Sequence, residues 1–563
     1  MSHASAQGAS KCHESDWVTR AWLTLMLALH LGLGAWSASL STPTADEFAH
    51  VPAGLAYWSH AAWPLYSKNP PAVKLYLTLP LIAGLAGSLH IPEVNVPAFG
   101  WGPWQYGSEF ERANEPVYLQ AFFWARLMNL LLSASTGFLV FAWARRLTSE
   151  VMAAVAASGF LLSTTVLAHA SLATVDIGAS LAIFAFCFLL TRLGDHPTLY
   201  RLAGAGATLG LALTSKFTAL FVLPWFVLWL ILEPNRTRKR KLLWIAGTTF
   251  LVLNMSYGFS SPWRTLDSFH FTSRLMNSAT GWLPASTPIP VPCDFVAGFD
   301  AQVGDAEQGE FSNYLLGEWS RDGWWYYNLA ALGLKENPLT LLLFFTVPFA
   351  FWGVRRDKWF PLAIPLIALA LPLLFFNPLQ VGVRYLLPLF PFVFVLIAFV
   401  LQKLTDKFGG RAGFSMAAVA LLAWLFTALT AAPDFVSAFS PLVKGDKARY
   451  LLDSNLDWGQ DLYRVRKISA QYKGEIGLVY FGHVPPSLYG IHYHLPLNPT
   501  SRGVAVVSAN YLRGMSYVVT APDGTWVQLP PDTMVWLKTQ KPKAIEGSLY
   551  IYDLDHPLPA DAP

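Results

Sequence analysis

The sequence predicts an all-α polytopic membrane domain followed by a small α/β domain outside the membrane. Only 13% of its 563 residues are charged and 54% are hydrophobic, whereas roughly a quarter of the residues in a soluble domain are charged. About eleven apolar runs are long enough, or nearly so, to cross a bilayer as helices. Beyond residue 432 these runs give way to short strand-like segments. We therefore divide the chain into a membrane domain, 1–432, and a tail, 433–563.

The apolar runs follow one another from the N-terminal segment onward. The first, 21–40, has no convincing small-residue cleavage site after it, so we interpret it as a retained span and not as a signal peptide. The other runs are centred near residues 131, 158, 182, 207, 225, 250, 346, 368, 393 and 422. Segment 72–87 is apolar but short and carries Lys74 and Pro80, which favours an interfacial or re-entrant helix.

Basic residues lie in alternate connections between these runs. Arg145, Arg146 and the basic run 236–241 are examples, and the positive-inside rule places such loops in the cytoplasm. The N-terminus is then cytoplasmic, and the loops 41–117 and 259–337 and the tail are extracytoplasmic. We expect a multi-pass protein of the cell (inner) membrane, in contact with membrane lipids. The net charge of +4 is too small to indicate a nucleic-acid partner.

The tail has the mixed pattern of a small α/β domain. A helix is expected over 457–472 and strands over 476–481, 504–509 and 548–552, separated by Pro- and Gly-rich turns. The three cysteines of the chain have no metal-ligand spacing, and no pair of histidines is spaced four residues apart on a helix. The sequence therefore predicts no metal and no other cofactor, although an ion held by Asp46 and Glu47 stays open.

The first candidate site follows the first span, where Asp46 and Glu47 adjoin each other and His50 follows. Neighbouring carboxylates raise one another's pKa, and a raised pKa suits a general base. The alternative is a solvated helix N-terminus, because acidic residues are favoured in a first helical turn.

Four further charges lie within or beside the apolar runs on the same predicted side of the membrane: Arg126, Asp176, Lys216 and Arg384. Burying a charge at membrane depth costs roughly 2.5–3.5 kcal/mol, so such residues usually serve a function. Snorkelling to the interface is the alternative for the last three, and an ion pair with Asp176 is the alternative for Arg126. The charges together predict an acid–base site with a clamp for an anionic lipid headgroup.

Aromatic residues mark the second long outer loop, in the run Gly323-Trp324-Trp325-Tyr326-Tyr327. Rings of this kind bind sugars, and Trp324 and Tyr327 are candidates for that role. Anchoring at the bilayer interface is the alternative.

An ordered set of motifs resembles the bacterial polyprenyl-phosphate-dependent glycosyltransferases of the GT-C fold group, which includes protein O-mannosyltransferases and the lipid A aminoarabinose transferase. The set spans almost the whole chain. It comprises Asp46-Glu47-Phe48-Ala49-His50, Asn69-Pro70-Pro71 with Lys74, Ala-Thr-Val-Asp176, Leu-Thr-Ser-Lys216, Gly323 to Tyr327, Lys335 with Pro338, Arg384-Tyr385-Leu386-Leu387-Pro388 and Asp453-Ser454-Asn455-Leu456-Asp457-Trp458-Gly459-Gln460-Asp461.

The resemblance implies roles for the candidate residues. Asp46, beside Glu47, matches the family's catalytic base. Lys216 and Arg384 resemble the cations that hold the carrier phosphate, with Arg126 and Lys74 as additional phosphate-binding candidates. Asp176 matches a second acidic residue that contacts sugar or acceptor, and His50, Trp324 and Tyr327 are grouped with it as candidate sugar- or acceptor-binding residues.

The sequence differs from two members of this group at specific positions, which makes their particular substrates or domain arrangement less expected here. Phe48-Ala49-His50 stands where the aminoarabinose transferases carry Thr-Arg-Tyr, and the loop 259–337 is too short for the β-trefoil domain of the eukaryotic-type mannosyltransferases.

The function expected is transfer of a sugar, with inversion, from a polyprenyl-phosphate carrier to a hydroxyl of a protein, glycan or lipid. A hexosyltransferase such as a mannosyltransferase is one form of it. The alternative is a transporter or flippase of a lipid-linked or anionic substrate. Such proteins show pseudo-symmetry between halves, which this sequence lacks.

Overall fold

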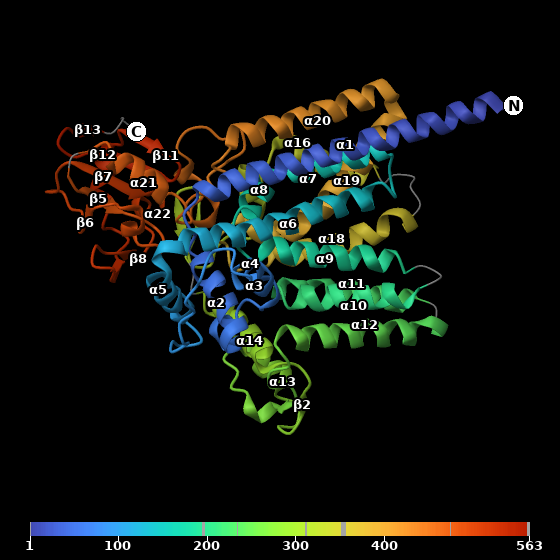
Figure 1. Ribbon diagram of the computed structural model, residues 1–563, viewed down its shortest axis with the longest axis horizontal. Helices are drawn as coiled ribbons and strands as arrows, with labels where there is room; N and C mark the ends of the chain where they lie inside the picture. Colours follow the sequence, from blue (N-terminus) through green and yellow to red (C-terminus); the bar gives the residue numbers. More distant parts are fainter. Residues whose placement is uncertain are drawn as a thin grey trace.

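The computed structural model describes residues 2–193, 197–233, 235–309, 312–350, 356–472 and 474–559. Each apolar run predicted from the sequence is helical, and these helices run side by side (Figure 1). They are α1 (Ser2–Leu40), α6 (Tyr118–Ala144), α7 (Glu150–Leu162), α9 (Asp176–Thr191), α10 (Leu199–Leu213), α11 (Leu223–Leu232), α12 (Asn235–Ser256), α16 (Pro338–Phe345) with α17 (Val347–Ala350), α18 (Arg356–Phe375), α19 (Phe390–Phe408) and α20 (Gly410–Ala431).

Length and composition qualify fewer of these helices as membrane spans. Among the described residues, four helical stretches are long and apolar enough to cross a membrane: Trp17–Leu40, Gly102–Ala144, Val383–Phe408 and Gly410–Ala431. A fifth results if α7 and α8 (Thr164–Ala170), which meet at a bend of 57°, count as one span. Five shorter apolar helices accompany them. The chain is thus a helical protein with several apolar helices, and the count of about eleven crossings stays a prediction.

Short helices close the bundle at the end nearest the tail (Figure 1). Segment 72–87 forms α3 (Ala72–Leu77) and α4 (Leu79–Ile82), which are too short to cross a bilayer. The remaining helices used below are α2 (Glu47–His60), α5 (Gly102–Asn114), α13 (Arg274–Thr280), α14 (Cys293–Gln308), α15 (Tyr327–Lys335) and the 3-10 helices η3 (Phe217–Val222) and η5 (Val383–Leu389).

The tail is built on a five-stranded mixed sheet with the order β11-β12-β7-β5-β6. Strands β5 (Ile476–Val479), β7 (Val504–Ser508) and β12 (Leu549–Asp553) lie where the sequence predicts strands. The flanking strands β6 (Tyr493–His494) and β11 (Ala544–Glu546) are short, as are the paired β8 (Tyr517–Thr520) and β9 (Trp526–Leu529) and the paired β10 (Gln540–Lys541) and β13 (Leu558–Pro559).

The predicted tail helix begins later than expected. The structure places α21 at Leu462–Ser469, whereas the sequence predicts 457–472. The residues before it form the 3-10 helix η7 (Asp453–Asn455) and a turn. Gly459 has a φ of +89°, a left-handed conformation that ends helical propagation and that glycine adopts without strain. Residues 456–461 are therefore irregular and not helical, and this segment contacts the membrane domain.

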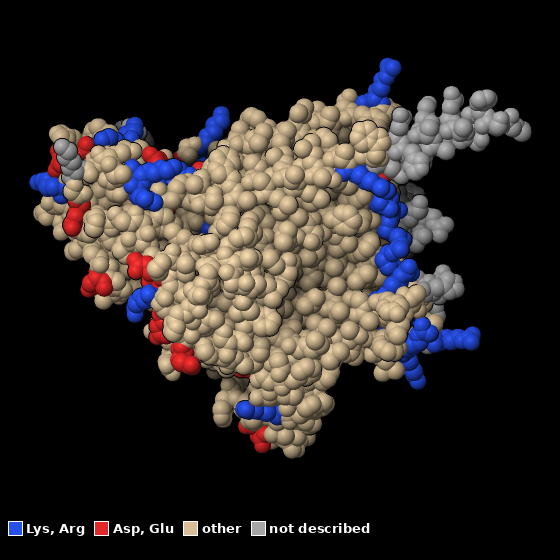
Figure 2. All heavy atoms as spheres, viewed as in Figure 1, with Lys and Arg blue, Asp and Glu red and all other residues tan. Residues whose placement is uncertain are grey.

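The tail and the helical bundle share their hydrophobic core. One buried cluster joins Phe160 of α7 and Phe394 of α19 to Trp458 and Val507 of the tail. A second joins Phe48 of α2 to the tail residues of α21 and β5. The two domains proposed from the sequence are therefore in direct apolar contact. On the face shown in Figure 2, Lys and Arg side chains gather at the helix ends away from the tail.

Candidate active site

Asp46 and Arg384 form an ion pair between the residue preceding α2 and the helix η5. Arg384 Nη1 donates to Asp46 Oδ2. Their side chains are 10% (Arg384) and 20% (Asp46) exposed, so the pair lies near the surface of the site. Within the described part of the chain, the Nε–H of Arg384 is buried without a hydrogen-bond partner. This cation therefore has donor capacity left for an anion.

Asp176 and Lys216 form a second ion pair close by. Lys216 Nζ lies 2.5 Å from Asp176 Oδ1, joining the start of α9 to the residue before η3. Tyr385 connects this pair with the first, because its ring centre lies 4.4 Å from Lys216 Nζ and 5.5 Å from the Arg384 guanidinium. The structure thus brings together four of the residues singled out in the sequence: two carboxylates and two cations around one tyrosine ring.

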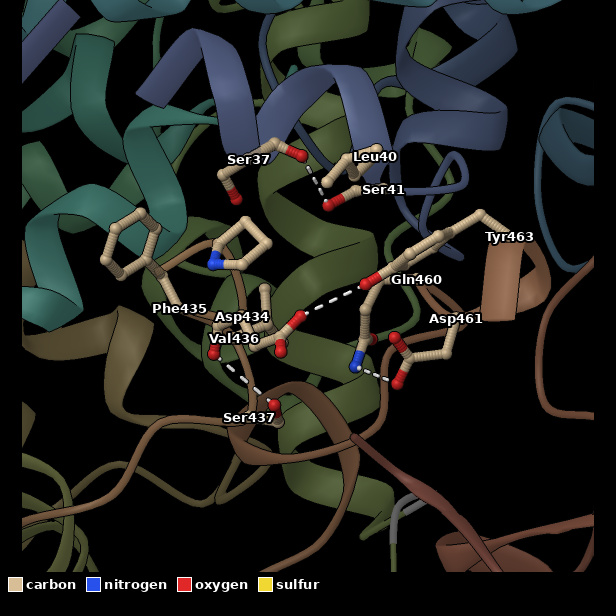
Figure 3. A pocket seen from close by; sticks show the side chains of 11 residues that line it. Ser37, Leu40, Ser41, Asp434, Phe435, Val436, Ser437, Gln460, Asp461 and Tyr463 are labelled. Atoms are coloured by element: carbon tan, nitrogen blue, oxygen red, sulfur yellow. Dashed lines mark hydrogen bonds between the residues drawn. The ribbon is translucent and has the colours of Figure 1, made fainter. Parts of the chain in front are cut away.

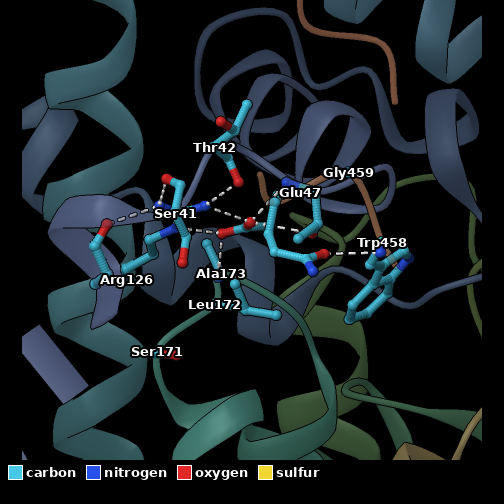
Figure 4. A network of polar contacts seen from close by, with 12 residues as sticks. Ser41, Thr42, Glu47, Arg126, Ser171, Leu172, Ala173, Trp458 and Gly459 are labelled. Carbon is cyan, nitrogen blue, oxygen red and sulfur yellow. Dashed lines mark hydrogen bonds and ion pairs between the residues drawn. The ribbon is translucent and has the colours of Figure 1, made fainter. Parts of the chain in front are cut away.

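Glu47 forms a closed network with Arg126 (Figure 4). Both carboxylate oxygens of Glu47 accept from Arg126 at 2.7 Å, and they also accept from the backbone N–H groups of Thr44 and Ala173. Arg126 donates its remaining N–H groups to the carbonyls of Ala38, Ser41 and Thr42. All five of its donors are therefore engaged inside the protein.

This network differs from the sequence-based expectations. Arg126 pairs with Glu47 and not with Asp176. The side chains of Arg126 and Glu47 are 2% and 0% exposed. Because every N–H of the guanidinium is already hydrogen-bonded, Arg126 has no donor for a phosphate in this conformation. The geometry indicates a scaffold that ties α6 to the end of α1 and to the residues before α9.

Lys74 is likewise enclosed by protein atoms. Its ammonium donates to Tyr57 Oη at 2.8 Å and to the carbonyls of Tyr66 and Asn69 at 2.9 and 2.6 Å. These three bonds use all the donors of a lysine. A close approach of α2 and α3 makes this possible, because a Cβ at Gly54 would lie 2.6 Å from the carbonyl oxygen of Lys74. In this conformation Lys74 therefore stabilises the packing of α2 against α3.

The other predicted contact residues occupy different surroundings. His50 is 1% exposed, and in the described part of the chain neither ring nitrogen has a hydrogen-bond partner. Burial lowers the pKa of His50 to about 4, and the charges of Asp46 and Asp176 oppose this shift. His50 is therefore a neutral ring beside the ion pairs. Trp324 donates its backbone N–H to Gln380, and Tyr327 is fully buried with its hydroxyl bonded to Asn455.

The tail contributes residues to the site that the sequence did not assign to it. The indole ring of Trp458 lies 4.3 Å from the Arg384 guanidinium. Asp453 has a left-handed φ of +53°. Burial raises the pKa of Asp453 to about 6, the charge of Arg384 opposes that rise and the charge of Asp46 adds to it. The motif from Asp453 to Asp461 is part of the resemblance noted in the sequence, but nothing in its pattern indicates contact with Arg384.

A pocket lies at a different place on the seam between the two domains (Figure 3). It is lined by the end of α1, the linker 433–437 and residues 460–463. Asp434, which accepts from Tyr463 Oη and pairs with Arg464, lies in its wall. The two ion pairs are outside this pocket. Among the described residues, no group of three or more His, Cys, Asp or Glu side chains is placed to hold a metal ion.

Part of the helical bundle matches a family model. Residues 119–257, which carry Arg126, Asp176 and Lys216, match the family model described as Dolichyl-phosphate-mannose-protein mannosyltransferase. The match covers α6 to α12. Over this part of the chain it confirms the resemblance to lipid-phosphate-dependent membrane glycosyltransferases that the motifs indicate. No curated protein matches the chain.

Three solved structures are among those that match the chain, all at low identity. ArnT from Cupriavidus metallidurans bound to undecaprenyl phosphate is 13% identical, with a TM-score of 0.46 over 94% of this chain and 97% of that chain. AglB from Archaeoglobus fulgidus, in complex with an inhibitory peptide and a dolichol-phosphate, is 11% identical, with a TM-score of 0.48 over 91% and 75%. The S. cerevisiae Pmt1–Pmt2 complex bound to the sugar donor is 15% identical, with a TM-score of 0.31, and covers 43% of this chain and 33% of that chain.

Proposed function

We propose that the chain is a membrane glycosyltransferase that moves a sugar from a polyprenyl-phosphate carrier to an acceptor hydroxyl, with inversion at the anomeric carbon. The observation that carries this proposal is the pairing of Asp46 with Arg384 beside Asp176 with Lys216 around Tyr385. Two cations can neutralise a carrier phosphate, and a carboxylate beside them can accept a proton. The family match over residues 119–257 supports the same chemistry.

In the proposed reaction, Arg384 exchanges its partner. The carrier phosphate binds the guanidinium in place of Asp46, which frees the Asp46 carboxylate to accept a hydrogen bond from the acceptor hydroxyl. The acceptor oxygen then forms a bond to the anomeric carbon, and its proton passes to Asp46. The bond from that carbon to the phosphate oxygen breaks, and the polyprenyl monophosphate leaves with the electron pair. Lys216 and Arg384 stabilise the charge that grows on this phosphate.

Sidedness belongs to the same proposal. The site lies at the end of the helices next to the tail, and the row of basic side chains that gathers at helix ends in Figure 2 lies at the other end. If these basic ends face the cytoplasm, the site faces outward, where a carrier in the bilayer supplies the sugar. The acceptor class, protein, glycan or lipid, is left to experiment, as is a preference for mannose.

The test supplies purified full-length protein in nanodiscs with a panel of polyprenyl-phosphate sugars and acceptors, and follows sugar transfer and release of the carrier phosphate. We expect turnover with at least one donor and a loss of about 10²–10⁴-fold on Asp46→Asn. Asp532→Asn, an exposed tail position, is the matched control. Undiminished transfer by Asp46→Asn would exclude the proposed base. Carrier movement across the bilayer without bond cleavage would instead establish the flippase alternative.

A further inference from the structure

Segment 453–461 of the tail lies between the two chain segments that carry the Asp46–Arg384 pair. On the Asp46 side, the carbonyl of Trp458 accepts from the N–H of Ala45 at 3.0 Å. The carbonyl of Gln460 accepts from the N–H of Thr42 at 2.9 Å. These two bonds hold the loop that ends at Asp46 against the tail.

The same segment also holds the backbone of η5 next to Arg384. Asn455 Oδ1 accepts from the N–H of Val383 at 2.9 Å, and Ser454 Oγ donates to the carbonyl of Val381 at 2.7 Å. The carbonyl of Asn455 accepts from Lys335 Nζ at 2.5 Å, which gives this buried lysine of α15 a partner. Gly382 is required between these bonds, because a Cβ there would collide with Ser454 Oγ.

Trp458 contacts both the loop that ends at Asp46 and the Arg384 side chain. Its carbonyl binds the loop before Asp46, and its ring centre lies 4.3 Å from the Arg384 guanidinium. The residue is buried, with 2% of it exposed, and its backbone N–H donates to Gln460 Oε1 at 2.8 Å, which holds the main chain at this position. Figure 4 shows Trp458 and Gly459 on the tail segment next to the Glu47 network.

We propose that Trp458 is a positioning residue that keeps the Arg384 guanidinium in place while it exchanges Asp46 for the carrier phosphate. The inference rests on the proposed function for the identity of that anion. An arginine that leaves its carboxylate partner gains rotamer freedom, which must be lost again when it binds the next anion. Stacking on an indole face preserves the plane and position of the guanidinium through this exchange. The tail is then a wall of the active site and not only a separate recognition module.

The experiment measures binding of a polyprenyl monophosphate to purified full-length protein in nanodiscs, together with sugar transfer and thermal unfolding. The variants are Trp458→Leu, which removes the aromatic face, and Trp458→Phe, which keeps a smaller one. Trp458→Met replaces the leucine variant if that variant does not fold. Trp536→Leu makes the same change at a partly buried tail position outside the described contacts of Arg384.

We expect Trp458→Leu to weaken monophosphate binding and to raise the KM for the donor by about tenfold. Trp458→Phe should recover most of this loss, and Trp536→Leu should bind as the wild type does. Equal binding by Trp458→Leu and wild type would overturn the proposal. So would equal losses in Trp458→Leu and Trp458→Phe that follow only the fall in unfolding temperature. Wild-type protein that binds the monophosphate but transfers no sugar would refute the proposed function and leave the Trp458 comparison decisive.

Discussion

Asp46 and Glu47 are consecutive acidic residues with opposite surroundings. Glu47 is fully buried. Arg126 donates two charge-assisted hydrogen bonds to it and donates its other N–H groups to backbone carbonyls. Asp46 is partly exposed and bonds to Arg384, whose Nε–H is buried without a partner in the described chain. Adjacency in sequence therefore says little about shared chemistry. Saturation of hydrogen-bonding capacity distinguishes the scaffold from the site.

The two networks also differ in what removal of one member leaves behind. A buried charge without its partner keeps the full desolvation cost, whereas a charge near water is hydrated again. The Glu47 network should thus respond to mutation mainly through folding. The Asp46 network should respond mainly through activity. Each prediction below tests one side of this contrast.

The largest effect is expected for Arg126→Met. This change leaves the Glu47 carboxylate buried without its cation and removes the donors to Ala38, Ser41 and Thr42. We expect a loss of about 3–5 kcal/mol in the free energy of unfolding, measured by denaturant or thermal unfolding in detergent. Transfer activity per folded molecule should change little.

The double variant Arg126→Met with Glu47→Leu controls for this effect, because removal of both charges should recover part of the stability. A stable but inactive Arg126→Met protein would return Arg126 to the carrier-binding role predicted from the sequence.

A slightly smaller effect, on activity, is expected for Arg384→Ala. Loss of the cation proposed to stabilise the leaving phosphate should lower kcat/KM by about 10²–10³-fold, which corresponds to roughly 3–4 kcal/mol. The unfolding temperature should fall only slightly, because Asp46 is 20% exposed and regains hydration. Steady-state transfer assays and thermal unfolding measure the two quantities on the same preparation. Arg384→Lys keeps the charge without the planar guanidinium, so its kcat/KM should lie between those of the wild type and of Arg384→Ala. If Arg384→Ala markedly lowers the unfolding temperature but leaves kcat/KM normal, the Asp46–Arg384 pair has a structural role and not a catalytic one.

The positions of the helices could be predicted from the sequence because each apolar run must satisfy its backbone internally if it enters a bilayer. The grouping of Asp46, Asp176, Lys216 and Arg384 at one end of the bundle also agrees with their predicted sidedness. The division between Asp46 and Glu47 could not be predicted. It depends on which way each side chain leaves the start of α2, and on the carbonyls that the end of α1 presents to Arg126.

The tail shows a second limit of the same kind. Its main strands follow from runs of β-branched residues, since such side chains pack well on a sheet. Trp458 carries no local signal for contact with Arg384, because the two lie far apart in the chain and meet only in the folded structure, where Ser454 and Asn455 bond to the backbone beside Arg384.

The smallest effect concerns pH and the third carboxylate near Arg384. Burial raises the pKa of Asp453 to about 6, above about 3.9 for an unfolded aspartate. A carboxyl group whose pKa is raised by folding favours the folded state at low pH, and this contribution is lost as the pH rises through about 6. Asp453→Asn should therefore unfold at a higher temperature than wild type at pH 7–8 and at a similar temperature near pH 4. After allowance for partial exposure, the difference should be about 1–2 kcal/mol. Asp457, whose pKa is raised to about 7 chiefly by burial, titrates in both proteins and cancels from the comparison. If Asp453→Asn and the exposed control Asp532→Asn show the same dependence of unfolding temperature on pH, Asp453 is not held beside Arg384. The site then comprises only Asp46, Asp176 and their two cations.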